Sequence, residues 1–143
     1  MGPDAAARAM VKIAHISDLH CGEASPSRLD RARDAINSQG CDVVVATRDI
    51  THSGRRREYA VARRFFAALN APVVGCPGNH DAPVFDPVVR LFSPFSRFEG
   101  LGLASRWDSK CGLVSIRSFN SARAVQLRWD WSQGAYVRQD FAA

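Results

Sequence analysis

Three short apolar runs constrain this chain most, because each one stops at a cluster of polar side chains. The runs and the clusters that follow them are Lys12-Ile13-Ala14-His15-Ile16-Ser17 before Asp18-Leu19-His20, Asp42-Val43-Val44-Val45-Ala46-Thr47 before Arg48-Asp49, and Pro72-Val73-Val74-Gly75-Cys76-Pro77 before Gly78-Asn79-His80-Asp81. Apolar runs of this length, rich in β-branched residues, are typical of strands that are covered on both faces. We therefore predict three strands, each ending in a polar loop.

Two segments with helical spacing separate these strands. The first follows Ser25-Pro26-Ser27, has apolar residues at 29, 32, 35 and 36, and ends at Gly40; the second opens at Ser53-Gly54 and has an apolar stripe at 59, 62, 66 and 69. Alternating strands and helices predict a parallel sheet with right-handed crossovers. The loops that follow parallel strands lie at one edge of the sheet, where α/β proteins bind ligands. We therefore expect five side chains to meet there: Asp18, His20, Asp49, Asn79 and His80.

Length and composition are those of a single globular domain. The chain has 143 residues, of which 46% are hydrophobic and 23% charged, enough to bury one core. No apolar run reaches the roughly eighteen residues of a membrane span, and residues 1–10 lack the pattern of a signal peptide. The four cysteines have neither zinc-type nor disulfide-type spacing, so we expect reduced thiols in a cytoplasmic protein. The net charge of +5 suits an anionic partner.

The residue types at the predicted sheet edge indicate a transition-metal site. Asp18 and His20 offer a carboxylate oxygen and an imidazole nitrogen, a mixture that suits Mn, Fe, Zn or Ni better than Ca. Asp49 could bridge two cations about 3.5–4 Å apart, as in two-metal phosphoryl hydrolysis. Asn79 adds an uncharged oxygen, and His80 could protonate a leaving oxygen or stabilise negative charge on a phosphate. Ordinary loop polarity is the alternative interpretation of this set.

The motifs Asp18-Leu19-His20, Asp49 and Gly78-Asn79-His80-Asp81, in this order and each after a predicted strand, resemble those of the calcineurin-like metallophosphoesterase superfamily. Residues 15–20 and Thr51-His52-Ser53-Gly54 are most similar to its bacterial members of the cyclic-nucleotide phosphodiesterase type. The resemblance covers roughly residues 11–120. It implies an α/β fold, α+β by some schemes, in which a β-sandwich is flanked by helices. For this chain we expect an incomplete N-terminal βαβαβ portion plus a β-hairpin.

The resemblance also implies a dinuclear metal centre that activates water, and a role for each site residue. Four residues would hold the metals: Asp18 and His20 the first, Asp49 as the bridge, and Asn79 the second. His80 would be the catalytic acid or phosphate-stabilising residue, oriented by Asp81. His52 could reach the substrate, or it could contact a metal ligand without binding the metal itself. A solvated loop position without such a role is an equal alternative.

The sequence departs from the family pattern in two places. The family completes its centre with histidines from its C-terminal half, whereas this chain has histidines only at 15, 20, 52 and 80. The simplest interpretation is a leader at 1–10 and a domain at 11–143 that is truncated before its C-terminal half. The second departure is Arg48, where the family has Gly. Its cation would repel a metal ion and impair the site; pairing with Asp49 in place of a metal is the alternative.

Beyond Asp81 the pattern is weaker. We predict at most a short helix at 86–92, and two strands, 101–107 and 111–119, joined by a turn at 108–110. Residues 120–134 show no periodicity, and 136–143 are typical of the start of a helix. The cluster Arg55-Arg56-Arg57 opens the second helix, where it would either face solvent or make the mouth of the site positive. We interpret His15, inside the first strand, as a core histidine.

The sequence thus predicts a metal-dependent phosphoesterase that hydrolyses a phosphomonoester or phosphodiester, with cyclic nucleotides among the candidates. For the 143-residue chain we expect one weakly bound metal or none, and little turnover. The alternative is a non-catalytic remnant or basic interaction module with a degenerate site. We expect neither a nucleic-acid nor a membrane partner, but we do expect self-association through an uncovered sheet edge.

Overall fold

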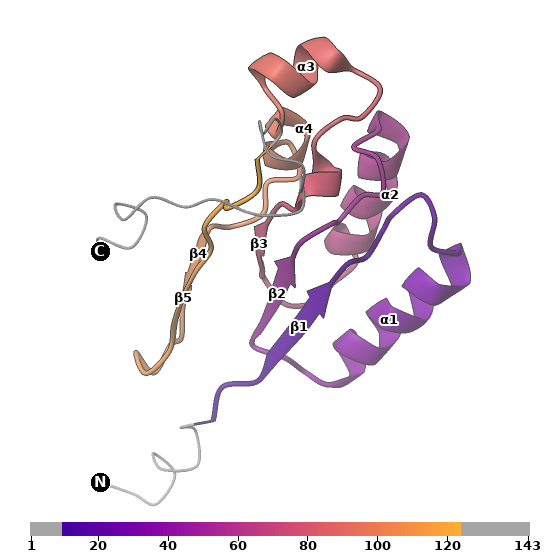
Figure 1. The fold of residues 1–143 in the computed structure, drawn as a ribbon. Coiled ribbons are helices and arrows are strands. Elements are labelled where there is room, and N and C mark those ends of the chain that lie inside the picture. Colours follow the sequence, from indigo (N-terminus) through magenta and orange to yellow (C-terminus); the bar gives the residue numbers. More distant parts are fainter. Residues whose placement is uncertain (1–9, 124–143) are drawn as a thin grey trace, which may run out of the picture.

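The computed structural model describes residues 10–123; the expected leader, Met10 excepted, and the expected C-terminal helix lie outside the described residues. The elements follow in the order β1 (Ile13–Ser17), α1 (Pro26–Ser38), β2 (Val43–Thr47), α2 (Arg56–Ala67), β3 (Val73–Cys76), the 3-10 turn η2 (Asn79–Asp81), α3 (Pro87–Phe92), α4 (Ser96–Glu99), β4 (Arg106–Asp108) and β5 (Ser115–Arg117). The predicted strand–helix–strand–helix–strand order is confirmed (Figure 1).

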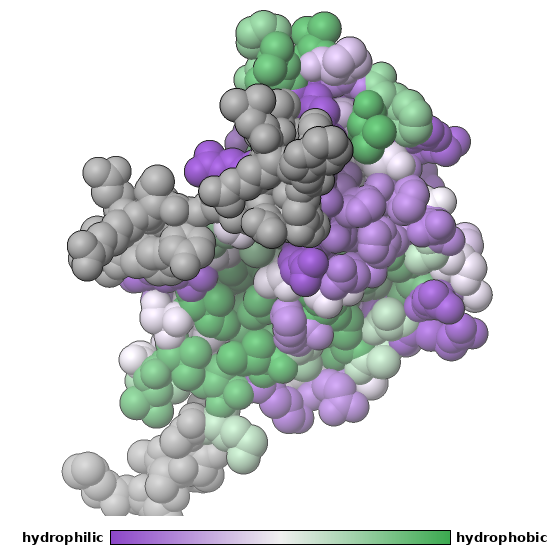
Figure 2. Space-filling view, viewed as in Figure 1, coloured by the Kyte–Doolittle hydropathy of each residue, from purple (hydrophilic) through white to green (hydrophobic). Residues whose placement is uncertain are grey.

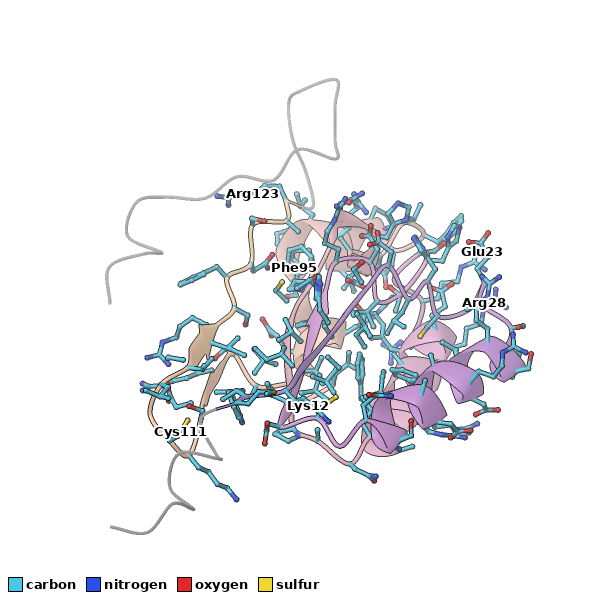
Figure 3. The ribbon with its side chains drawn as sticks, turned by 90° about the horizontal axis from the view of Figure 1, so that it is seen from below. Lys12, Glu23, Arg28, Phe95, Cys111 and Arg123 are labelled. Atoms are coloured by element: carbon cyan, nitrogen blue, oxygen red, sulfur yellow. The ribbon has the colours of Figure 1, made fainter. Side chains whose placement is uncertain are left out.

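β1, β2 and β3 form a parallel sheet with β2 in the middle. Ile16 pairs with Ala46, and Ala46 pairs with Gly75, so the three strands end at the same edge. α1 and α2 lie together on one side of this sheet, and the β4–β5 ribbon lies on the other side (Figure 1, Figure 3). The fold is therefore mixed α/β, with a three-stranded parallel sheet flanked by helices.

Local sequence explains where the two longer helices begin. Pro26 occupies the first turn of α1, where its missing N–H would have no partner in any case. α2 is capped by its own residue Glu58, whose carboxylate accepts hydrogen bonds from the backbone N–H of Arg55 (3.1 Å) and of Ser53 (2.9 Å). Glu58 is buried, and Arg55 is the residue whose N–H it caps. The helix α2 therefore begins at the next residue, Arg56, and not directly after Gly54.

The core lies between the sheet and the two helices. Its buried members are Cys21, Leu29, Ala46, Ile50, Tyr59, Ala62, Phe65, Phe66 and Phe98. Phe65 and Phe66 of α2 pack edge to face with ring centroids 5.5 Å apart, and burial of one such side chain contributes roughly 1.5–3 kcal/mol. This packing fixes the helices against the sheet, and with them the loops at its carboxyl edge.

The predicted hairpin exists but is shorter than expected. β4 and β5 are three residues each, with Trp107 opposite Ile116. Leu101 and Leu103 pack against the core instead of joining the hairpin. Ala104 then bridges β3, donating to the Val73 carbonyl and accepting from the Gly75 N–H, each at 3.0 Å. The apolar residues at 101 and 103 are thus drawn to the core, which leaves fewer residues for β4.

The sheet face opposite the helices is partly covered within residues 10–123: Val43 of β2 and Val74 of β3 are buried on it, whereas Ile13 of β1 is exposed. His15 on β1 is exposed, and its Nε2 lies 2.8 Å from Thr47 Oγ1 on β2. The prediction of a core histidine is therefore wrong, because nothing among residues 10–123 covers this position. None of the helices in the same range is long and apolar enough to cross a membrane.

Candidate metal centre

The loops after β1, β2 and β3 meet at one edge, as the sequence predicts. The His20 N–H donates to the Asp49 carbonyl (3.0 Å), and the His80 N–H donates to Asp49 Oδ1 (3.1 Å). Asp18, His20 and Asp49 each direct one potential ligand atom to a common place, with these atoms within 4.8 Å of one another. Asp49 is buried, whereas Asp18 is exposed. Asp49 therefore lies on the protein side of the three ligand atoms, and Asp18 lies on their solvent side.

The backbone of these loops is strained where the candidate ligands lie. Four non-glycine residues in the described range have φ in the left-handed region: Asp18 (54°), His20 (45°), Arg48 (59°) and Asp49 (38°). Such a conformation costs about 1–2 kcal/mol per non-glycine residue. Strain of this kind concentrates at functional sites, where the surrounding structure enforces it. All four residues lie in the two loops that carry the group.

The left-handed conformation explains why glycine suits position 48. A glycine adopts a φ of 59° without steric cost, whereas Arg48 does not. Among residues 10–123 the exposed Arg48 side chain forms no ion pair, so pairing with Asp49 is not observed.

Gly78 allows the third loop to lie against Asp49. A Cβ atom at this position would overlap both Oδ1 and the backbone nitrogen of Asp49. Only glycine fits such an approach without displacing the carboxylate. Gly78 therefore places the Asn79-His80 pair directly beside the Asp49 side chain.

Asp81 ties the second and third loops together. Its buried carboxylate accepts hydrogen bonds from the backbone N–H of Thr51 (2.8 Å), Gly78 (2.9 Å) and Ile50 (3.2 Å), and from the Thr51 hydroxyl (2.8 Å). Burial raises the pKa of Asp81 above its ordinary value, and the hydrogen bonds from Gly78 and Thr51 oppose that rise. Asp81 thus sets the distance between the two loops.

The His80 ring is oriented by a backbone carbonyl and not by Asp81. Its Nδ1 lies 2.7 Å from the His52 carbonyl oxygen, and since a carbonyl can only accept, Nδ1 carries the hydrogen. Nε2 of His80 is then the nitrogen left for a ligand or a proton. The sequence-based expectation that Asp81 orients this ring is corrected by this contact, because the Asp81 carboxylate accepts from backbone N–H groups and from the Thr51 hydroxyl.

His20, His52 and His80 form a second group that shares His20 with the first. Their ring centroids are 5.4, 5.6 and 5.7 Å apart, and one ligand atom from each lies within 4.8 Å of the others. His20 Nδ1 is buried and has no hydrogen-bond partner among the described residues. His52 Nδ1 lies 3.2 Å from the Glu23 carboxylate, at ion-pair distance but without hydrogen-bond geometry. A buried nitrogen without a partner is a place where a metal ion fits.

The remaining residues of the sequence prediction lie in or beside the same loops. Asn79 opens η2, one residue before His80, and so belongs to the third loop. Arg55 stacks over the Phe85 ring at 4.2 Å, while Arg56 and Arg57 are exposed.

The sequence did not lead us to two carboxylates near the site: Glu58, the buried cap of α2, and Glu23, which lies beside His52. A Glu three residues after Arg55 was the available signal for the first; nothing in the sequence signalled the second.

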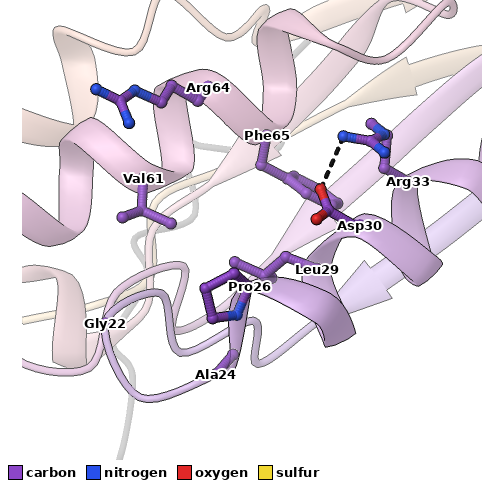
Figure 4. Close-up of a pocket in the computed structure, with 9 residues that line it drawn as sticks. All are labelled: Gly22, Ala24, Pro26, Leu29, Asp30, Arg33, Val61, Arg64 and Phe65. Carbon is purple, nitrogen blue, oxygen red and sulfur yellow. Dashed lines mark hydrogen bonds and ion pairs between the residues drawn. The ribbon is translucent and has the colours of Figure 1, made fainter.

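Of two hollows given by the described residues, the smaller touches the candidate ligands. A hollow of about 360 Å³ is lined by Asp18, His20, Glu23 and Arg28, among others. A larger one of about 480 Å³ lies between α1 and α2, where Arg33 pairs with Asp30 at 2.8 Å (Figure 4). The larger hollow contains no candidate ligand, so we assign the site to the smaller one.

These observations define a class: an α/β protein whose strand-end loops gather histidine and aspartate side chains that could hold a metal. The chain matches the calcineurin-like phosphoesterase family over residues 11–135 and belongs to that family. It is also similar to the glycerophosphodiester phosphodiesterase GpdQ of Enterobacter lignolyticus, with 50% identity over 40 residues. Those residues make up 28% of this chain and 14% of the relative, so the match spans a small part of that protein.

Proposed function

We propose that this protein is a metal-dependent phosphoesterase acting on a phosphodiester or phosphomonoester, cyclic nucleotides among the candidates. One observation carries the proposal: Asp18, His20 and Asp49 bring their ligand atoms within 4.8 Å of one another, and the His80 N–H is bonded to Asp49 itself. Membership of the calcineurin-like phosphoesterase family supports a phosphate-ester substrate. The name of the GpdQ relative supports a diester.

The residues present fit a divalent transition metal. Asp18, His20 and Asp49 would hold one ion, and Asn79 with Asp49 would contribute to a second. Carboxylate oxygens combined with imidazole nitrogen suit Mn, Fe, Zn or Ni, and the unpartnered Nδ1 of His20 is consistent with such a ligand. When bound, such ions polarise a phosphoryl oxygen and lower the pKa of coordinated water.

His80 is proposed to manage the proton of the leaving group. The hydrogen on Nδ1 is held by the His52 carbonyl, which favours the ring orientation in which Nε2 faces away from that carbonyl. A second proton on Nε2 would be the one delivered to the leaving oxygen, or it would stabilise negative charge on the phosphate. Arg28 lines the hollow beside Asp18 and His20, where its guanidinium could bind phosphate oxygens.

The proposal is tested by hydrolysis of a chromogenic phosphodiester with and without added Mn²⁺. We expect slow, metal-dependent turnover by the 143-residue chain and faster turnover by Arg48→Gly, because the cation beside the ligands is removed. His80→Ala should abolish turnover in both backgrounds, while His15→Ala should not change it, since His15 lies within β1 and outside both groups. Absence of metal-dependent turnover in both the parent and Arg48→Gly would instead favour a non-catalytic interaction module.

A further inference from the structure

We propose that Phe85, backed by Arg55, is the specificity-determining residue of the site and stacks on a flat aromatic group of the substrate, such as a nucleobase. The Arg55 guanidinium lies 4.2 Å from the centroid of the Phe85 ring and covers one of its faces. The Phe85 side chain is nevertheless 68% exposed, so the opposite face is available. An aromatic ring with an open face is a platform on which a base or another flat ring can stack.

The two segments that carry this pair begin at the candidate metal centre and lie side by side. His80 Nδ1 is 2.7 Å from the His52 carbonyl oxygen, and further along both segments the Val84 N–H donates to the Ser53 carbonyl (3.2 Å). The stacking ring belongs to the residue directly after Val84. Since three residues span at most about 11 Å, the Cα atom of Arg55 lies within that distance of the Cα atom of His52. The subsite is thus within reach of a substrate whose phosphate lies at the centre.

The hollow at this place is positive. It has a volume of about 210 Å³ and is lined by Arg55, Arg56, Asp86 and Arg97, among others. The Asp86 carboxylate accepts a hydrogen bond from Arg97 (2.6 Å), which neutralises its charge. Arg55 and Arg56 form no ion pair within residues 10–123. Their guanidinium groups therefore remain available for phosphate oxygens beside the aromatic ring.

Charge and aromatic surface together favour one kind of ester. An arginine binds the phosphate of any ester, whereas Phe85 contributes only when the group attached to the phosphate has a π-face. An aliphatic group such as glycerol gains nothing from stacking. The subsite therefore rests on the proposed function and narrows its substrate to esters that carry a flat aromatic group.

The test compares AMP with ribose 5-phosphate, which lacks the base, as ligands of the metal-free 143-residue chain in saturation-transfer NMR titrations. We expect AMP to bind at least about fivefold more tightly, the low end for stacking of a base on an aromatic side chain. Phe85→Leu should remove this advantage and leave the affinity for ribose 5-phosphate unchanged. Arg56→Gln should weaken both ligands by a common factor of about two to five. The matched control Phe92→Leu, at an exposed phenylalanine of α3 outside the hollow, should change neither affinity.

Three outcomes would overturn the proposal: equal affinities of the parent for the two ligands, equal losses of AMP affinity in Phe85→Leu and Phe92→Leu, or a loss in Phe85→Leu that is as large for ribose 5-phosphate as for AMP. Should Phe85→Leu fail to fold, as judged by circular dichroism, nuclear Overhauser effects between the adenine protons and the Phe85 ring of the parent decide, and their absence would refute stacking.

The binding experiment is independent of the hydrolysis experiment because it needs neither metal nor turnover. Absence of metal-dependent hydrolysis counts against the proposed function, while the preference for AMP and its loss in Phe85→Leu still establish the subsite. Metal-dependent hydrolysis without any such preference would leave the proposed function in place and refute the subsite alone.

Discussion

At the scale of single residues, the backbone angles of the site matter as much as its side chains. Asp18, His20 and Asp49 carry potential ligand atoms, so the left-handed conformation of each residue positions a candidate metal ligand. Arg48 shares that conformation, but its exposed side chain carries no ligand atom and forms no ion pair within residues 10–123. Its strain is therefore not compensated by an ion pair of its own side chain within residues 10–123.

Arg48→Gly should stabilise the folded protein by about 1 kcal/mol. The substitution removes a left-handed non-glycine conformation that costs about 1–2 kcal/mol. Glycine also raises the conformational entropy of the unfolded chain, and this offsets part of the stabilisation. Urea unfolding measures the difference in free energy. The matched control is Arg31→Gly in the exposed interior of α1, which should destabilise by about 1 kcal/mol; a loss of similar size at position 48 would contradict the strain.

The cysteines should differ in reactivity because their surroundings differ. Burial, followed by the nearby charges of Asp81 and Glu58, raises the pKa of Cys21 to about 12. The Cys111 thiol is exposed, and its hydrogen bond with the Ser109 hydroxyl lowers its pKa below the ordinary value. Since the thiolate is the reactive form, iodoacetamide at pH 8 should label Cys111 first and Cys21 last. Mass spectrometry of a time course checks the order, and early labelling of Cys21 would contradict it.

At the scale of elements, loop positions follow from strand order, but loop contacts do not. The parallel arrangement of β1, β2 and β3 is readable from apolar runs and helical spacing, and it brings Asp18, His20, Asp49 and His80 to one edge. The contact between His80 Nδ1 and the His52 carbonyl depends on the path of two loops, which no periodicity encodes. The hairpin length was overestimated for a similar reason: Leu101 and Leu103 could serve either a strand or the core, and the core holds them.

Asp81→Asn should loosen the junction between the second and third loops. An amide can replace only one of the two carboxylate oxygens as acceptor, so the donors facing the other oxygen lose their partner. An unsatisfied buried donor costs about 1–3 kcal/mol, and we expect a loss of about 2–4 kcal/mol in urea unfolding. Asp30→Asn, on the exposed side of α1, should cost less than about 0.5 kcal/mol. Equal effects at the two positions would show that Asp81 does not join the loops.

At the scale of the whole molecule, the described part leaves apolar surface and one strand edge uncovered. β1 pairs with β2 alone, so its outer edge is free within residues 10–123. Hydrophobic residues also gather over α3 and near the hairpin (Figure 2). Val88, Leu91 and Phe92 of α3 are exposed by 66%, 63% and 77%. Free edges and apolar patches of this kind favour association.

We expect the chain to self-associate through the β1 edge. Light scattering should then show an average mass that rises with protein concentration. Ile13→Lys, which places a charge on this edge strand, should lower that rise because charged residues discourage strand pairing. Leu91→Lys, the matched change on α3, should have little effect. A larger effect at position 91 would assign the association to α3, and a constant monomer mass would contradict the prediction.

The most direct test of the account is paramagnetic broadening of backbone amide signals by substoichiometric Mn²⁺. If loops 18–20, 49–52 and 78–81 form one cation site, their signals should broaden together, while those of the β4–β5 hairpin stay sharp. Broadening confined to one loop, or spread evenly over acidic residues across the surface, would show that the three strand ends do not act as a single metal site.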